Sequence, residues 1–167
     1  GQVRGASAMM GCTIPPCTVP SKVLDARKAG KQTSVMKNDP LVRAAVDARL
    51  RAYAPYSRFQ VGAAVETVDG LIFAGCNVEN AAYPEGTCAE AGAIAAMALA
   101  GGRRIRRVVV CGGGDAPCTP CGGCRQKIRE FGVADTRVTM VSPQGEIMVE
   151  RTLADLLPDS FGPGSLS

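Results

Sequence analysis

The fold is decided by the stretch IRRVVVCGGGDAPCTPCGGCRQKIREFG, residues 105–132. Its first seven residues, 105–111, are rich in β-branched side chains and predict a short buried strand. A loop of glycines and prolines follows, and residues 121–131 then have the pattern of a helix that Gly132 ends. A strand that leads through a loop into a helix is the repeating unit of a layered α/β sheet. This stretch therefore predicts an α/β fold.

The segments on both sides continue this alternation. Asn38 or Asp39 before Pro40 is typical of a helix start, and an Asp-Gly pair at 69–70 between two β-type runs is a strong hairpin signal. The predicted elements are a helix over 41–50, strands over 59–67 and 71–78, a helix over 88–100, the strand over 105–111, the helix over 121–131, strands over 138–141 and 146–149, and a helix over 152–157.

The length of 167 residues suits one compact domain. Residues 1–38 lack sustained periodicity and are interrupted by prolines, so we expect a flexible leader or extension there. We expect a single catalytic domain over 39–163 and a short tail over 164–167. Because the sequence contains no run of about 18 apolar residues, we expect no membrane partner.

The net charge of +4 lies in the leader. Residues 1–35 carry five Lys and Arg against one Asp, which leaves 14 basic residues (19 less five) and 14 acidic residues (15 less one) in the rest. A protein that binds a phosphate backbone usually carries its positive surplus on the folded domain. We therefore expect no nucleic-acid partner, with the four arginines of 103–107 as the one candidate patch.

Histidine is absent from the sequence. This excludes a triad built on histidine, an imidazole general base and a histidine ligand to zinc. Catalysis by this chain must use carboxylates, thiolates, lysine or tyrosine, or a metal that is bound without imidazole.

The spacing of the cysteines indicates a metal site rather than a set of disulfides. Cys118, Cys121 and Cys124 form C-x-x-C-x-x-C, and Cys88-Ala-Glu90 stands at another predicted helix start, where thiolates are stabilised. Three thiolates on Zn²⁺ leave a fourth position for water, whose pKa the metal lowers from about 15.7 towards ~7. Zinc deaminases use such a set with a glutamate that is not a ligand, and Glu90 has the matching place.

The alternative is a structural zinc site that is closed by four protein ligands. Cys88, Cys118, Cys121 and Cys124 could supply the four ligands that structural zinc normally takes, and the chain would then be a zinc-stabilised interaction module. Pro117-Cys118-Thr-Pro-Cys121 is also a P-C-x-x-C element. The spacing of Glu90 has no purpose in a closed site, which favours the open one.

Five motifs resemble those of the small homotetrameric cytidine deaminases, which depend on zinc. In chain order they are YAPYSRFQVGAAV (53–65), CNVEN (76–80), CAE (88–90), PCGGCRQ (120–126) and LLPDSFGP (156–163). The resemblance covers residues 39–163 and implies a three-layer α/β/α fold around a mixed sheet of about five strands.

The resemblance implies that Cys88, Cys121 and Cys124 bind one Zn²⁺ per subunit and that Glu90 carries protons to the base and the departing amine. The implied reaction is hydrolysis of cytidine or 2′-deoxycytidine to uridine or 2′-deoxyuridine with release of ammonia, in pyrimidine salvage. Three free thiolates need reducing conditions, which predicts a cytoplasmic protein. The family often has Arg after Cys-Ala-Glu, whereas this chain has Ala91.

The resemblance also implies the contacts of the substrate. Asn77 and Glu79 would bind the ribose, chiefly its 3′-hydroxyl. Phe59 would pack against the pyrimidine, and the backbone of Ala89 would meet the polar edge of the base. Phe161 would reach the site of a neighbouring subunit in the homotetramer.

Two other deaminase functions stay open. An enzyme of the same fold could act on another aminopyrimidine nucleoside, such as blasticidin S, although the Asn77-Val-Glu-Asn80 motif favours ordinary nucleosides. A polynucleotide editor is the third possibility. The balance of basic and acidic residues after residue 35 argues against it, because such an enzyme must bind a phosphate backbone.

Overall fold

A computed structural model describes residues 38–166, so the predicted leader lies outside the described residues except for Asn38. The strands form one five-stranded sheet in the order β2-β1-β3-β4-β5. Their bounds are β1 (Gly62–Thr67), β2 (Ile72–Cys76), β3 (Ile105–Cys111), β4 (Arg137–Val141) and β5 (Ile147–Thr152). β3 and β4 run parallel and the other neighbours antiparallel, which confirms the predicted mixed sheet.

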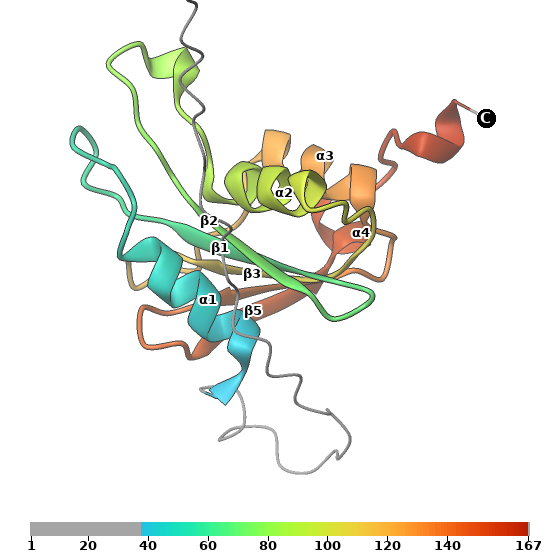
Figure 1. The fold of residues 1–167 in the computed structure, drawn as a ribbon, viewed down its shortest axis with the longest axis horizontal. Coiled ribbons are helices and arrows are strands. Elements are labelled where there is room, and N and C mark those ends of the chain that lie inside the picture. The colour runs from blue at the N-terminus through green and yellow to red at the C-terminus, as the bar shows by residue number, and fades with distance from the viewer. Residues whose placement is uncertain (1–37, 167) are drawn as a thin grey trace, which may run out of the picture. The chain divides into compact units, whose positions relative to one another are not determined.

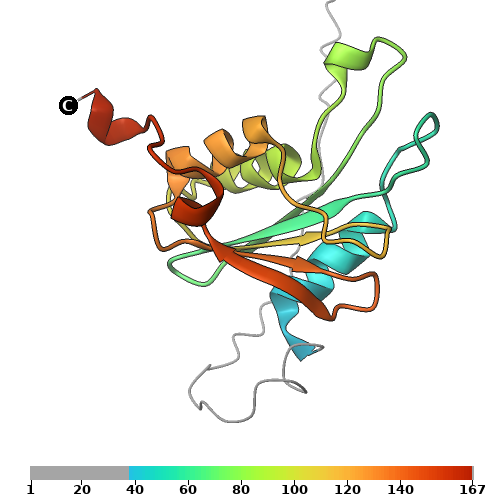
Figure 2. The same cartoon turned by 180° about the vertical axis from the view of Figure 1, so that it is seen from behind.

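Helices cover both faces of this sheet, which confirms the three layers. α1 lies on one face, and the other helices lie on the opposite face (Figure 1, Figure 2). The helices are α1 (Pro40–Arg49), α2 (Ala89–Leu99), α3 (Gly122–Phe131) and α4 (Leu153–Leu156). Val108 and Val110 belong to the core under α2, and Val109 belongs to the core under α1. Because both faces are covered, every residue of β1 is buried and neither side of the strand faces solvent.

The predicted strand over 59–67 begins three residues later than expected, at Gly62. The Asn77 side chain binds the backbone at two residues just before this point. Its Nδ2 donates to the carbonyl of Phe59 over 2.9 Å, and its Oδ1 accepts from the amide of Val61 over 2.8 Å. These bonds hold residues 59–61 as a loop, so that part of the strand prediction is wrong.

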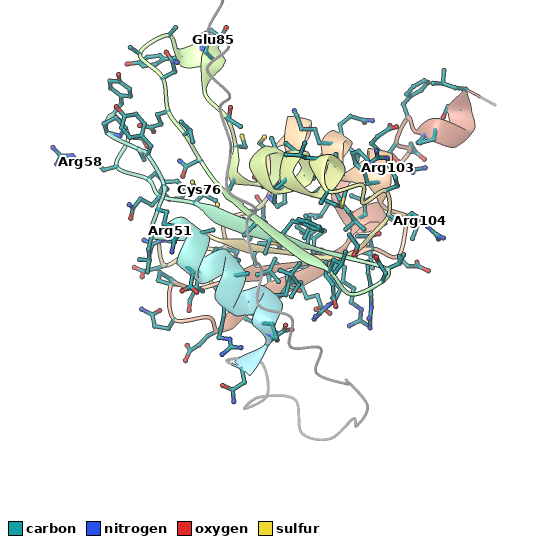
Figure 3. The ribbon with its side chains drawn as sticks, viewed as in Figure 1. Arg51, Arg58, Cys76, Glu85, Arg103 and Arg104 are labelled. Atoms are coloured by element: carbon teal, nitrogen blue, oxygen red, sulfur yellow. The ribbon has the colours of Figure 1, made fainter. Side chains whose placement is uncertain are left out.

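Three of the four arginines in 103–107 form contacts within the fold, among them Arg106, whose Nη1 lies 4.0 Å from a carboxylate oxygen of Glu66. Arg103 donates to the carbonyls of Ala98 (2.9 Å) and Gly102 (2.8 Å) at the end of α2. Arg107 pairs with Asp39 at the start of α1, where N and O lie 2.8 Å apart, and with Glu66 on β1. Figure 3 shows Arg103 and Arg104 at the end of the domain remote from Arg58. Among the helices between residues 38 and 166, none is long and apolar enough to cross a membrane.

The close approach of α2 to β2 depends on Gly75. A Cβ atom at this position would lie 2.3 Å from the backbone nitrogen of Ala93 and 2.5 Å from the carbonyl oxygen of Ala89. Backbone atoms cannot rotate out of the way as a side chain can. The absence of a side chain at Gly75 therefore sets the distance of α2 from the sheet, and with it the position of the N-terminus of α2.

We predict that Gly75→Ala lowers the free energy of unfolding by about 3 kcal/mol, the upper part of the range for overpacked cores, because α2 must move away from the sheet. Urea denaturation followed by circular dichroism measures this. Gly114→Ala is the matched control, since the nearest atom to a Cβ there is 3.9 Å away. Equal stability of the two variants would contradict the packing argument.

Candidate active site

Two helix N-termini bring three cysteines together. Cys88 precedes the first residue of α2, Cys121 precedes the first residue of α3, and Cys124 lies in the first turn of α3. The Sγ atoms of Cys88 and Cys121 are 3.9 Å apart, and all three sulfurs lie within 4.8 Å of one another. Tetrahedral zinc with Zn–S bonds of ~2.3 Å spaces its sulfur ligands about 3.8 Å apart. The three thiols therefore fit a zinc ion without rearrangement of the helices.

Cys118 lies outside this group. Within residues 38–166, the three thiols form the only set of three or more potential metal ligands that come this close together. Cys118 instead packs against the core under α2, and burial raises the pKa of its thiol to about 11. The geometry favours the three-cysteine set over the four-cysteine alternative.

The pKa values of the three thiols in the cluster are shifted in different directions. The backbone amide of Cys124, at the start of α3, lowers the pKa of the Cys121 thiol, as expected at a helix N-terminus. Burial raises the pKa of the thiols of Cys88 and Cys124. Glu90 is only 4% exposed, and its Oε2 lies 3.3 Å from the Sγ of Cys124. A buried carboxyl group thus stands directly beside the sulfur cluster.

Arg125 fixes the loop that leads into Cys121. Its Nε donates to the carbonyl of Pro120 and its Nη1 to the carbonyl of Leu156, each over 2.8 Å. The guanidinium therefore ties the residue before Cys121 to the end of α4.

A cavity of about 560 Å³ ends at Cys88. Its walls are two loops, one before β1 and one between β2 and α2, which lie side by side beyond the edge of the sheet (Figure 1, Figure 2). The lining residues are Tyr56, Ser57, Asn77, Val78, Glu79, Asn80, Tyr83, Gly86, Thr87 and Cys88. This volume is typical of a site for a small molecule.

Asn77 and Glu79, which the sequence analysis expects to bind the ribose, line this cavity and also hold its wall. Glu79 accepts hydrogen bonds from the amides of Tyr56 (2.9 Å) and Ser57 (3.2 Å) and from the hydroxyl of Ser57. The bond from the Ser57 hydroxyl is the main cause that lowers the pKa of Glu79, and the two amides add to it. Glu79 is therefore a carboxylate that can only accept hydrogen bonds.

The other predicted substrate residues lie in different surroundings. Ala89 is fully buried in the first turn of α2. The side chain of Phe59 is 46% exposed and does not line the cavity of the single chain. Phe161 is 60% exposed on the segment after α4, where its carbonyl accepts a bond from Gln126 over 3.0 Å.

The sequence analysis missed residues of the cavity wall. Tyr56 and Tyr83 come from the two loops and meet edge to face, with ring centroids 6.2 Å apart and an interplanar angle of 65°. Ser57 and Thr87 also line the cavity. Tyr56 and Ser57 lie inside the motif over 53–65, which would have been the signal, but neither forms a pattern with chemistry of its own.

Comparisons with known proteins agree with this geometry. The family profile described as "Cytidine and deoxycytidylate deaminase zinc-binding region" matches residues 35–140. A protein named cytidine deaminase from Halalkalibacterium halodurans is 42% identical over 126 residues, which cover 75% of this chain and 95% of that protein. Another, from Mycobacterium tuberculosis strain H37Rv, is 41% identical over 119 residues, which cover 71% and 84%.

Solved structures give the same result. The crystal structure of cytidine deaminase from Burkholderia pseudomallei superposes with a TM-score of 0.68 at 45% identity, over 72% of this chain and 96% of that one. That of the M. tuberculosis enzyme has a TM-score of 0.65 at 39% identity, over 73% and 94%. Because the family profile covers residues 35–140 and the relatives match in both sequence and fold, this chain belongs to the cytidine and deoxycytidylate deaminase zinc-binding family.

Proposed function

We propose that this chain is a cytidine deaminase, which hydrolyses cytidine and 2′-deoxycytidine to uridine and 2′-deoxyuridine and releases ammonia, in pyrimidine salvage. One observation carries the proposal: Glu90 is buried beside three thiols that fit zinc, where a cavity for a small molecule ends. The relatives named cytidine deaminase match over nearly their whole length. The catalytic domain would span residues 39–163, followed by the tail.

Cys88, Cys121 and Cys124 would hold one Zn²⁺ per subunit, which supplies a water of lowered pKa when it is bound. Glu90 would take one proton from that water and give it to N3 of the base. It would then take the second proton, from the hydroxyl group added at C4, and give it to the amine as the C4–N bond breaks. Its position supports this role, because the carboxylate touches Cys124 and only 4% of the residue is exposed. Burial of the Glu90 carboxyl group limits loss of the transferred proton to solvent.

The substrate contacts follow from the cavity. Glu79 and Asn77 would bind the ribose, since a carboxylate can accept the O–H of a sugar. The base would then extend towards Cys88, with the backbone of Ala89 at its polar edge. Phe59 lies on the loop that forms one wall of the cavity, and it would pack against the pyrimidine.

We also propose that four chains assemble and that Phe161 completes the site of a neighbouring subunit. Phe161 is 60% exposed, and Tyr83, which lines the cavity, is 78% exposed, so both leave apolar surface uncovered in one chain.

We place the protein in the cytoplasm. The six cysteines of the described residues are all free, and thiols that bind a metal must stay reduced. A reducing compartment keeps them so.

The proposed activity predicts that zinc-loaded protein removes the ultraviolet absorbance of cytidine and produces uridine and ammonia. Glu90→Gln keeps the size of the side chain but cannot carry the proton. We expect its kcat to fall by at least ~10²-fold, the contribution typical of general acid–base catalysis, while its zinc content is unchanged. Equal turnover by both proteins would refute the role of Glu90, and no turnover by the wild type would refute the activity.

The proposed ligand set predicts different results for two cysteines only six residues apart. Cys124→Ser removes a thiolate of the cluster, so we expect loss of bound zinc and of activity. Cys118→Ser is the matched control, because Cys118 lies outside the cluster, and it should retain the zinc content of the wild type. Zinc is measured by atomic emission after dialysis against a weak chelator. Zinc loss in Cys118→Ser would instead favour a four-cysteine site.

The proposed assembly predicts the mass of four chains in size-exclusion chromatography with light scattering. Phe161→Ala should raise KM for cytidine while the zinc content stays the same, because the ring would contact substrate in another subunit. A monomer that is fully active would contradict both the assembly and the role of Phe161.

A further inference from the structure

The loop over 56–61, which carries Phe59, contains a strained residue. Arg58 has a φ of 59°, in the left-handed region that is costly for any residue with a Cβ, by roughly 1–2 kcal/mol. Figure 3 shows its side chain pointing away from the body of the domain. Such a conformation persists only where surrounding contacts determine it, and it is frequent at functional sites.

The Ser57 hydroxyl bridges the two sides of the strained residue. It accepts a hydrogen bond from the amide of Phe59 over 3.0 Å, and it donates one to Oε1 of Glu79. One side chain thus links the turn at Arg58 to the carboxylate in the cavity wall. Ser57 itself is exposed and belongs to neither core cluster.

The hydrogen bonds within the protein occupy most of the acceptor positions of the Glu79 carboxylate. An ionised carboxylate has about four acceptor positions, two on each oxygen. The amides of Tyr56 and Ser57 take those of Oε2, and the Ser57 hydroxyl takes one of Oε1. About one acceptor position therefore remains, on Oε1. The loop fixes both the orientation of the carboxylate and the oxygen that is left for a donor in the cavity.

We propose that Ser57 is a positioning residue for nucleoside binding: its hydroxyl orients Glu79 so that the remaining acceptor position of this carboxylate faces a sugar hydroxyl in the cavity. This inference rests on the proposed function, because it assumes a nucleoside in the cavity. It predicts that Ser57 acts through Glu79, so its effect depends on the sugar hydroxyl that Glu79 binds.

The test compares cytidine with 3′-deoxycytidine as substrates of Ser57→Ala. For cytidine we expect KM to rise about tenfold, close to the loss of one charge-assisted hydrogen bond, with kcat within about twofold of the wild type. For 3′-deoxycytidine, which lacks the donor, we expect KM to change by no more than about twofold. Ser57→Thr keeps the hydroxyl and should restore the KM for cytidine.

Ser142→Ala is the matched control. The Ser142 hydroxyl accepts from the amides of Gln144 and Glu146, both over 3.2 Å, in a turn between β4 and β5 outside the cavity lining. It should leave both KM values unchanged. Because Ser57 is exposed, Ser57→Ala should shift the melting temperature by no more than about 2 °C.

The outcomes separate the two proposals. A wild type that leaves cytidine unchanged overturns the proposed function, and this inference with it. If the wild type is active, a Ser57→Ala variant with unchanged KM overturns the inference alone. Equal losses for both substrates, failure of Ser57→Ala to fold, or failure of Ser57→Thr to rescue would assign Ser57 a structural role and also overturn it.

Discussion

The site depends on the placement of two helix N-termini above one sheet. α2 lies on β2 at the distance that Gly75 allows, because a side chain there would meet the backbone of Ala93 at 2.3 Å. α3 starts at the end of a loop that Arg125 ties to α4. These two constraints bring Cys88 and Cys121 to a separation of 3.9 Å between their sulfurs. The spacing of the proposed zinc ligands is thus a consequence of the close packing of α2 on β2 and of the hydrogen bonds of Arg125.

The two helix N-termini also supply positive potential, which stabilises the negative charge of the thiolates. Three thiolates carry a charge of −3, more than one Zn²⁺ neutralises, and the sequence places Ala91 where the family often has Arg. Unpaired amides at the start of α2 and α3 are a source of positive potential. The lowered pKa of Cys121, caused by the amide of Cys124, is an instance of this effect. The buried carboxyl group of Glu90 also lies in this site. The positive potential of the amides therefore offsets part of the negative charge of the sulfur ligands.

The order of helices and strands could be predicted from the sequence, because hydrophobic periodicity, an Asp-Gly turn and helix-ending glycines are local signals. The cysteine motifs and Glu90 could be predicted for the same reason, since their chemistry is encoded by spacing. The loop over 56–61 could not, because its conformation depends on bonds to Asn77 and Glu79, up to 23 residues away. The double use of Glu79, as an anchor of the loop and as a wall of the cavity, appears only in three dimensions.

The central claim is that zinc is bound by three cysteines and has an open position beside Glu90. X-ray absorption at the zinc edge of the loaded protein, without substrate, tests it most directly. The claim predicts three sulfur ligands at ~2.3 Å and one oxygen at about 2.0 Å, with the same spectrum in Cys118→Ser. Four sulfur ligands would contradict it, because a closed site leaves no position for the water that Glu90 is proposed to deprotonate.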